Sequence, residues 1–544
     1  MRLSRLGSLH QSRLSFMRIL LRRLASDAWT FDRPHFDIDN RGVGFAVYSA
    51  HGPERSYSLI AFSHDLPDDQ RSDRVIAEAW DTTFTLFDGV PTKEDVNRLS
   101  KNVPLQEAGR ITERELSLSR ANRSVRLWSH VVECLANGRQ PDITEIQNVG
   151  YLMRTTAVYG SGKFGAADRE TIADRPEFQA PFQVEMLSVY LIRTFVRDLV
   201  QHMAIATGGS NAATLDPDIA RQLGIGNSTG LGMAPFLINH PILFNNWIMV
   251  REEALSRVRS VQKAQHEEIE LFLAILQRSA ASIKTWKSDH PGQTKRIVGL
   301  TKDVNALRQH TTESLLATDY PWNGLVEWSQ STLSEEGQEL VNSLVLEPYP
   351  DLVDGLESCM ADVLEDSFVI DGSMTIGQAI DLILESFDWA TSIDWRAKSN
   401  CARAWYVSEE KLEPRLGERF DEPISEFEQP LAPARDAVSA LDDLRKFERD
   451  AEIADFLAAH PEHRHTMRRA QMSALAPYGE IRDNTISSDL LPIDMLRAKL
   501  SFFGAIHFDP RSDRWVRICM YSGAPYPDEL SSRNSDLWIY PEAH

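Results

Sequence analysis

Residues 184–203 read VEMLSVYLIRTFVRDLVQHM, and they set the architecture of the chain. Apolar side chains recur in this stretch at spacings of three and four, which is the period of an α-helix. One stripe is Val184, Leu187, Leu191, Phe195 and Leu199, and a second is Met186, Val189, Ile192, Val196 and Met203. A helix that is apolar on two faces is buried on both. The stretch therefore predicts a long core helix in the middle of the chain.

Strand-like segments stand before this helix and again at the end of the chain. They are rich in β-branched and aromatic residues and are separated by Gly, Pro and Asp. Four lie at Phe36–Asp39, Gly44–Ser49, Tyr57–Phe62 and Thr82–Phe87, and two more at Ser501–Phe508 and Trp515–Tyr521. Further helical patterns span Trp247–Lys287, Arg296–Leu316, Glu335–Leu344, Ile376–Phe387 and Ala434–Phe456. The predicted fold class is α+β, with a predominantly helical central domain and small antiparallel β elements near both chain ends.

Changes of composition divide the chain into five regions. These are a basic leader (1–26), a β-rich region (27–100), a helical core with glycine-rich loops (101–346), a helical region with an acidic linker (347–433), and a helical region with a C-terminal β-hairpin (434–544). The leader has six arginines and no acid. It is interpreted as disordered, as an import signal, or as untranslated, because Met17 offers a second start.

Charge and cysteine content exclude several classes of protein. The 79 acidic residues outnumber the 58 Lys and Arg, and a net charge of -21 repels a phosphate backbone, so no nucleic-acid partner is expected. The four cysteines are scattered without C-x-x-C spacing, which favours reduced thiols in the cytoplasm. The longest stretch without an ionised side chain, residues 222–250, contains prolines and asparagines, so no membrane span is predicted. Long apolar helices make a homo-oligomer an open possibility.

The first glycine-rich segment is YGSGKFG, from Tyr159 to Gly165. It matches G-x-G-x-x-G, in which glycines let a pyrophosphate approach the start of a helix. The sequence after it is polar, soon reaches Pro176, and has no second apolar strand with an acid about 20 residues on. Three interpretations stay open: an ordinary turn, a loop that binds another anion, and a nicotinamide site.

The second segment is GIGNSTGLGMAP, residues 224–235, followed by FLINHP. Its glycines free the backbone amides to turn inward, and Asn227, Ser228, Thr229, Asn239 and His240 add neutral donors and acceptors. Such a set suits a carboxylate or a phosphate. The alternative is a structural helix connection whose polar residues satisfy buried amides.

The run from Gly230 to His240, with Gly232, Phe236 and Asn239, is similar to the helix-start motif of β-hydroxyacid dehydrogenases. That resemblance implies a catalytic lysine where this chain has Phe236. Gly232-Met233-x-Pro235 resembles the flexible loop of the fumarase and aspartase superfamily. The lysine of that signature is also missing from this chain. Because both lysines are missing, the sequence predicts membership of neither family.

These patterns predict an enzyme of small-molecule metabolism that acts on a small anion, a carboxylate or a phosphate, by proton transfer. Lys163, His240 and Tyr159 are the candidate proton-transfer groups. The candidate binding residues are Arg154, Gly162, Asn227, Ser228, Thr229, Gly230 and Asn239. No particular cofactor is predicted. The alternatives are a non-catalytic helical interaction or scaffold protein and, third, a nicotinamide-dependent oxidoreductase.

Two further patterns consist of regularly spaced basic side chains. Arg120, Arg123 and Arg126 recur every three residues, as a cationic face towards a ligand or as a solvated stripe paired with acids. His460, His463 and His465 form H-x-x-H-x-H without a marked carboxylate partner, so no metal site is predicted.

Overall fold

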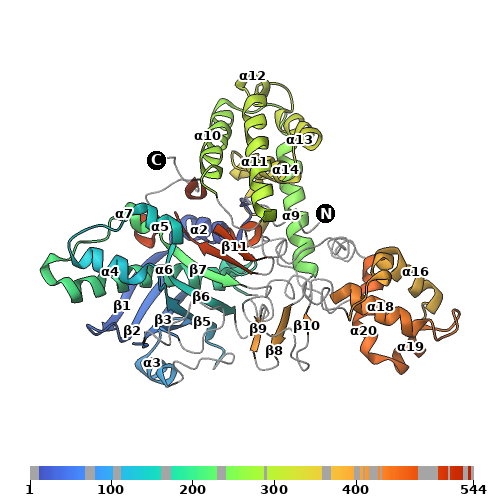
Figure 1. Cartoon of the computed structure of the whole chain (residues 1–544), viewed down its shortest axis with the longest axis horizontal. Helices are drawn as coiled ribbons and strands as arrows, with labels where there is room; N and C mark the ends of the chain where they lie inside the picture. Colours follow the sequence, from blue (N-terminus) through green and yellow to red (C-terminus); the bar gives the residue numbers. More distant parts are fainter. Residues whose placement is uncertain are drawn as a thin grey trace.

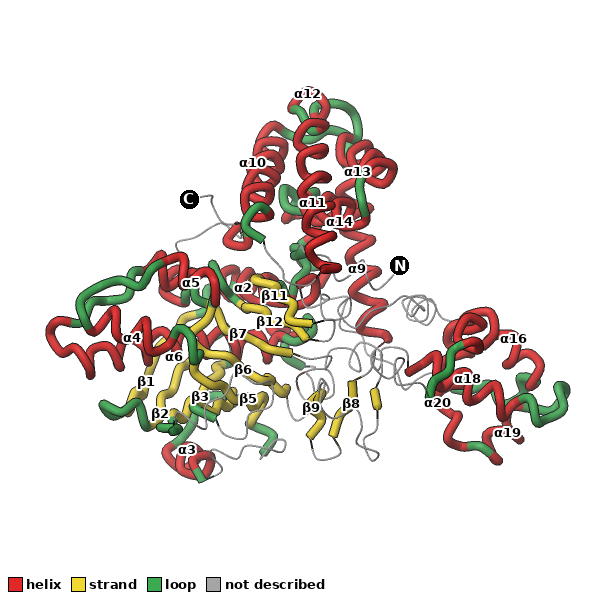
Figure 2. Tube along the Cα trace, viewed as in Figure 1, coloured by secondary structure: helices red, strands yellow, loops and turns green. Residues whose placement is uncertain are grey.

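The computed structural model describes residues 11–67, 80–101, 112–160, 172, 174–229, 241–286, 291–357, 369–396, 405–408, 411–415, 427–428, 432–475, 500–512, 515–530 and 537–540. In these ranges a large sheet with its helices, an upright helical bundle and a smaller helical unit occupy three regions of the molecule (Figure 1). Figure 2 separates the strands of the sheet from the surrounding helices.

The large sheet has nine strands in the order β1-β2-β3-β4-β5-β6-β7-β12-β11. Their bounds are β1 Thr30–Ile38, β2 Gly44–His51, β3 Ser56–Ser63, β4 Thr82–Asp88, β5 Glu115–Arg123, β6 Tyr151–Gly160, β7 Gly224–Thr229, β11 Ile506–Ser512 and β12 Trp515–Met520. All neighbours pair antiparallel except β6 and β7, which are parallel. A crossover helix between β6 and β7 makes this pairing possible.

That crossover is α6, Gln183–Gly208, which packs on one face of the sheet. The ring of Phe195 meets those of Tyr48 on β2 and Phe84 on β4 at centroid distances of 6.2 and 5.6 Å. Closer to the start of the helix, Ser188 is hydrogen-bonded to Ser117 on β5. The two apolar stripes of residues 184–203 therefore form a core helix, as predicted.

A buried arginine ties α6 to the last part of the chain. The Arg193 guanidinium donates to the carbonyl oxygens of Leu223 at 2.7 Å, Arg221 at 3.1 Å and Pro525 at 3.5 Å. It also lies 3.9 Å from the ring centroid of Tyr526. A cation that is 1% exposed inside a helix is tolerated because carbonyl dipoles and a ring face take the place of water.

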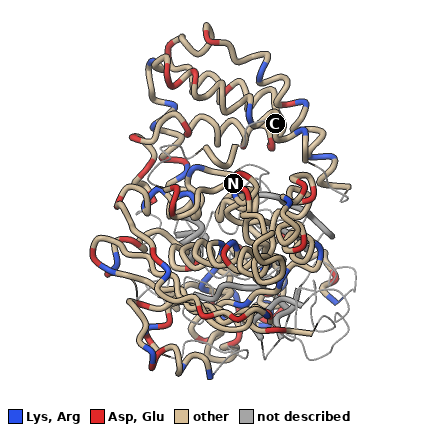
Figure 3. The backbone as a smooth tube through the Cα atoms, turned by 90° about the vertical axis from the view of Figure 1, so that its left-hand side faces the viewer, with Lys and Arg blue, Asp and Glu red and all other residues tan. Residues whose placement is uncertain are grey.

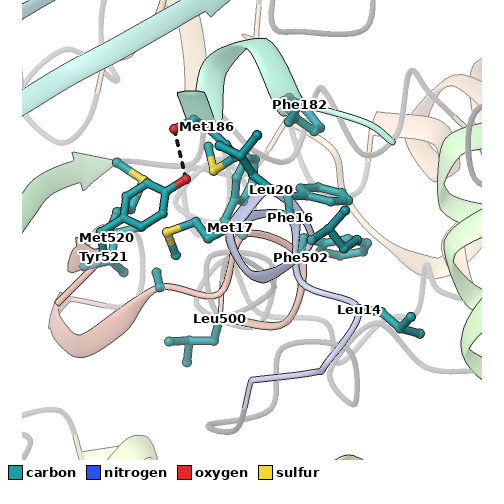
Figure 4. Close-up of a cluster of buried hydrophobic side chains, with 14 of the residues drawn as sticks. Leu14, Phe16, Met17, Leu20, Phe182, Met186, Leu500, Phe502, Met520 and Tyr521 are labelled. Carbon is teal, nitrogen blue, oxygen red and sulfur yellow. Dashed lines mark hydrogen bonds between the residues drawn. The ribbon is translucent and has the colours of Figure 1, made fainter. Parts of the chain in front are cut away.

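The basic leader supplies part of the core. Its residues 16–26 form α2, Phe16–Ser26, which packs against α6. The Phe16 ring lies 5.2 Å from that of Phe182 (Figure 4). It also lies 5.4 Å from the ring of Phe503. Met17 is fully buried beside it. Within these residues the leader is a largely buried helix, and its Arg18 and Arg22 contact acidic partners.

Those partners form a buried ion-pair cluster. Arg18, fully buried, donates two hydrogen bonds of 2.7 Å to the two carboxylate oxygens of Glu347. Arg13 adds a bond of 3.3 Å to Glu347 and binds Asp354, and Tyr540 donates to Glu347 at 3.2 Å. The cluster therefore joins the start, the middle and the end of the chain.

Smaller helices surround the sheet, and a second group forms the bundle. Around the sheet are α3 Lys93–Ser100, α4 Trp128–Ala136, α5 Ile143–Val149 and α7 Pro217–Gln222. The bundle consists of α9 Pro241–Arg259, α10 His266–Ile283, α11 Pro291–His310, α12 Glu313–Leu316, α13 Pro321–Thr332, α14 Glu335–Leu344 and α15 Pro350–Val353. Its core includes Trp322, whose ring meets Phe272 at 5.0 Å and whose indole N–H donates to Tyr349.

The smaller helical unit contains α16 Ile376–Phe387, α18 Ala432–Leu444, α19 Ile453–Ala459 and α20 Arg464–Leu475. A capping box of Thr375 and Gln378 begins α16. A separate three-stranded sheet has the order β10-β8-β9, with β8 Trp405–Ser408, β9 Lys411–Arg415 and β10 Phe427–Glu428. Single 3₁₀ turns are η3 Pro176–Phe178, η4 Gly209–Asn211, η7 Asp388–Ser392, η8 Pro461–His463, η9 Pro527–Glu529 and η10 Leu537–Ile539.

The combination of helices and strands agrees with the predicted class, and the predicted position of the strands near both chain ends agrees in part. The central region contributes β5, β6 and β7, so strands from both chain ends and from the middle share one sheet. The hairpins β1–β2 and β11–β12 lie at opposite ends of its strand order. The helical pattern 247–287, too long for a single globular helix, is divided into α9 and α10.

Charge and hydropathy of the described ranges add two observations. Acidic and basic positions are interspersed along the chain trace (Figure 3). Within those ranges, no helix combines the length and the apolar character that a bilayer crossing demands.

Candidate functional site

The two glycine-rich segments follow neighbouring strands. β6 ends at Gly160 and β7 ends at Thr229, and the two strands run parallel, with Arg154 opposite Gly226 and Thr155 opposite Asn227. The chain therefore leaves both strands towards the same edge of the sheet. Ligands of open α/β sheets commonly bind outside the carboxyl ends of parallel strands.

The structure describes only some of the predicted site residues. Arg154 and Asn227 lie in β6 and β7 with buried side chains. For Tyr159, Ser228 and Thr229, the strand position alone is described. The others lie outside the described residues: Gly162, Lys163, Gly230, Asn239 and His240.

Asn227 has a structural hydrogen bond. Its side-chain amide donates to the hydroxyl of Thr155 at 3.3 Å and more weakly to the Thr155 carbonyl at 3.4 Å. The Thr155 hydroxyl in turn donates to the carbonyl of Gly226 at 3.4 Å. These contacts between side chains and backbone carbonyls hold β7 against β6. Asn227 thus supports the strand pair that leads into both glycine-rich segments.

Arg154 lies well inside the sheet. Gly160 is the sixth residue after Arg154 along β6, and a rise of about 3.3 Å per residue places the two Cα atoms about 20 Å apart. Lys163 follows three residues later. The two predicted cationic residues therefore share a ligand only if the chain after Gly160 folds back along β6.

A second arginine lies near Arg154 on the same face of the sheet. Arg154 is paired with Asn122 on β5, and Arg120 stands two residues before Asn122 on that face. Arg120 is thus the diagonal neighbour of Arg154, with Cα atoms about 7–8 Å apart. Ser117, which contacts α6, points to the opposite face. Arg120 and Arg154 are 3% and 1% exposed, so this face holds two buried guanidinium groups away from α6.

The surroundings of these arginines are polar and aromatic. The Arg120 guanidinium lies 4.6 Å from the ring centroid of Trp80. Thr83, paired with Arg120, and Thr85 are fully buried on β4. Asn122 accepts a bond of 2.8 Å from the backbone amide of Asp81. We define the sheet-face arginine site as Arg120, Asn122 and Arg154.

Strand geometry splits the arginine stripe that the sequence suggested. Side chains alternate in a strand, so Arg123 turns to the face opposite Arg120. There it lies over the ring of Trp128 at 4.9 Å and near Asp81. Arg126 follows the strand and is exposed. The spacing of three marks a helix face, and this segment is a strand.

The nicotinamide interpretation receives a partial structural context. β6, α6 and β7 form a parallel β-α-β unit. In dinucleotide-binding proteins the glycine fingerprint lies in such a unit, between the first strand and the helix. However, α6 begins at Gln183, eighteen residues after Gly165, whereas the fingerprint glycines open their helix directly. The second strand, β7, also carries no acid at its end to bind a ribose. Both features argue against this class.

The buried thiol of Cys519 and the buried hydroxyls of Tyr190 and Tyr521 are poor nucleophiles or bases. Burial raises the pKa of Cys519 to about 12, so its thiol stays protonated at neutral pH. Burial likewise raises the pKa values of Tyr190 and Tyr521. Cys134 Sγ lies 3.6 Å from His130 Nε2, but Glu145 contacts the same nitrogen at 2.8 Å. A relay requires the acid on the opposite ring nitrogen, so this trio lacks triad geometry.

Residues with metal-ligand chemistry meet in the smaller helical unit. They are Asp443, His460, Glu462 and His463, while His465 is outside the group. The sequence marked the histidines but not the aspartate, which comes from another helix.

Comparison with known proteins gives no relationship: the chain matches no protein-family model, no curated protein and no solved structure.

Proposed function

We propose that the protein binds a small anion, a carboxylate or a phosphate, at the sheet-face arginine site. The observation that carries the proposal is the pair of buried guanidinium groups, Arg120 and Arg154, at diagonal positions on one sheet face. A guanidinium presents a fork of N–H donors that matches carboxylate and phosphate oxygens. Two arginines at diagonal positions, with Cα atoms about 7–8 Å apart, are within reach of each other's long side chains, so both could contact one anion.

We further propose that the glycine-rich segments after β6 and β7 contribute to this site, which requires the chain after Gly160 to fold back along β6. Their common origin at one edge of the sheet supports a shared role, and backbone amides of glycine-rich turns bind oxyanions. Lys163, His240 and Tyr159 remain the proposed proton-transfer groups, which would make the protein an enzyme of small-molecule metabolism. Arg154 keeps the binding role predicted from the sequence, and Arg120 joins it.

A thermal-shift panel tests the binding step. The full chain is melted with inorganic phosphate, succinate, nucleotides and nicotinamide cofactors, because a ligand at a hundredfold excess over its Kd stabilises by about 2.7 kcal/mol. The panel is repeated on Arg154→Met and Arg120→Met, each compared with its own ligand-free midpoint. Arg126→Met is the matched control, since Arg126 is exposed.

We expect one class of anion to raise the melting midpoint of the wild type and of Arg126→Met. The same anion should leave the melting midpoints of Arg154→Met and Arg120→Met unchanged. A shift with nicotinamide cofactors alone would favour the oxidoreductase alternative. If no compound shifts the wild type, the anion site is refuted and the non-catalytic interaction protein becomes the better description. Once a substrate is identified, full activity in a Lys163→Ala/His240→Ala double variant would reject those two residues.

A further inference from the structure

Four side chains with metal-ligand chemistry converge between α18 and the turn that precedes α20. Asp443 belongs to the last turn of α18, His460 follows α19, and Glu462 and His463 lie in η8. One ligand atom from each, two imidazole nitrogens and two carboxylate oxygens, lies within 4.8 Å of all the others. We call this group the His/carboxylate cluster.

The pairwise distances suit a small tetrahedral ion. Asp443 Oδ2 lies 2.8 Å from His463 Nε2 and 4.0 Å from His460 Nδ1, while Glu462 Oε1 lies 3.0 Å from His460 Nδ1. Ligands at about 2.0–2.1 Å from a zinc ion stand about 3.3 Å apart in a tetrahedron. The observed separations bracket this value. Small side-chain rotations therefore convert the cluster into a four-ligand shell.

Aromatic contacts hold the two imidazole rings. The His463 ring is parallel to that of Phe456, with an angle of 5° and a centroid distance of 5.7 Å. The His460 ring lies 5.3 Å from Phe456 and meets Phe447 edge-on at 5.9 Å. His463 is also buried, at 6% exposure. Ligands fixed in this way lose little conformational freedom when an ion binds.

Asp443 is oriented by a second group. Lys446 Nζ lies 2.6 Å from Oδ1, whereas the other oxygen, Oδ2, faces the histidines. A hydrogen bond to one carboxylate oxygen that leaves the other free for an ion is a recurrent outer-shell arrangement. Glu462 is the most exposed member, with 60% of its side chain accessible, so its place in the shell is open to solvent.

We propose that Asp443, His460, Glu462 and His463 form a binding site for Zn²⁺. Two imidazole nitrogens and two carboxylate oxygens suit zinc better than calcium or magnesium, which prefer oxygen alone. Bound zinc fastens the end of α18 to η8, and so to α19 and α20 on either side of that turn. This site is separate from the sheet-face arginine site and does not depend on it.

Cobalt titration of the metal-free full chain tests the site. Tetrahedral Co²⁺ absorbs strongly in the visible range, so one equivalent should produce a band that one equivalent of Zn²⁺ abolishes. Loss of an outer-shell partner typically weakens metal affinity by about 10–100-fold. Asp443→Asn and His463→Gln each remove a direct ligand, so each should weaken Co²⁺ affinity at least about 100-fold. His465→Gln is the matched control, because His465 is exposed and outside the cluster.

A substitution at the surface distinguishes loss of metal binding from misfolding. Glu462 is exposed, so Glu462→Gln should leave the circular dichroism spectrum unchanged while it lowers Co²⁺ affinity at least about tenfold. The proposal is overturned if the wild type gives no tetrahedral band at one equivalent. It is equally overturned if Glu462→Gln, Asp443→Asn and His463→Gln all bind as tightly as His465→Gln.

Discussion

Replacing Glu347 by Gln should be one of the most damaging single substitutions in the molecule. Glu347 is buried and accepts two hydrogen bonds of 2.7 Å from Arg18, one of 3.3 Å from Arg13 and one of 3.2 Å from Tyr540. Glutamine keeps the shape but replaces one oxygen by an N–H₂ group that points at a guanidinium. The Arg18 charge then remains in the core without its counter-charge.

Two routes give the same magnitude. Hydrogen bonds to charged groups contribute about 1.5–3 kcal/mol each, and the amide group displaces two of them. Removal of one partner from a buried ion pair costs about 3–5 kcal/mol in general. We therefore expect the free energy of unfolding to fall by about 4 kcal/mol. Urea unfolding of the full chain, followed by circular dichroism, measures this loss.

Two further variants make the result decisive. Glu253→Gln removes the exposed partner of Arg257 on α9, where an i,i+4 pair contributes about 0.3–0.5 kcal/mol. Arg18→Met combined with Glu347→Leu removes the Arg18–Glu347 pair as a whole, while Arg13 keeps Asp354 as its partner, and should recover most of the lost stability. A loss below about 1 kcal/mol in Glu347→Gln, or a double variant as unstable as the single one, would refute the reasoning.

Three other outcomes are expected. Phe16→Ala should lower the free energy of unfolding by about 3–5 kcal/mol in urea, because it empties a position packed by three phenylalanine rings, and a chain started at Met17 should lose at least as much. Arg193→Met should cost about 3 kcal/mol or more in the same assay, because buried carbonyls lose a charged donor. Burial lowers the pKa of His64, against the opposing effect of Asp81, so the folded state takes up fewer protons than the unfolded state as the pH falls through about 6.5. The free energy of unfolding therefore falls on acidification. Between pH 7.5 and pH 5 the urea midpoint of His64→Gln should fall less than that of the wild type. An equal fall in both proteins would count against this explanation.

Local patterns were sufficient for elements whose partners are close in sequence. The helices 335–344 and 376–387 have the predicted bounds, and β1 to β4 form the predicted antiparallel run. Period-2 or period-3.6 patterning and capping residues define such elements without reference to the rest of the chain.

The central strands could not be predicted in this way. β5 reads ELSLSRANR, whose apolar alternation ends after Leu118, and β7 reads GIGNST, which has a single large apolar side chain. They are strands because long-range neighbours pair with them and because buried serine, asparagine and arginine side chains find partners elsewhere in the fold. The buried leader has the same cause, since its charge is compensated by Glu347, more than 300 residues away.

The candidate sites divide along the same line. Arg154 and both glycine-rich segments were visible in the sequence, but the position of Arg120 beside Arg154 follows only from the register of β5 on β6. The H-x-x-H spacing was visible as well. Its aspartate lies about 20 residues earlier on another helix, so only the packing of α18 against η8 brings the four ligands together.

The position of β12 beside β7 has a consequence for synthesis on the ribosome. The edge of β7 that β12 covers becomes available when residue 229 emerges, and β12 is complete about 290 residues later. At about 5–20 residues per second, this edge waits roughly 15 to 60 seconds for its partner. An unpaired strand edge invites pairing with other chains, so the nascent protein should engage chaperones throughout this interval. Chains stopped before residue 515 should accordingly be recovered as aggregates or as chaperone complexes; their recovery as free folded monomers would contradict this view.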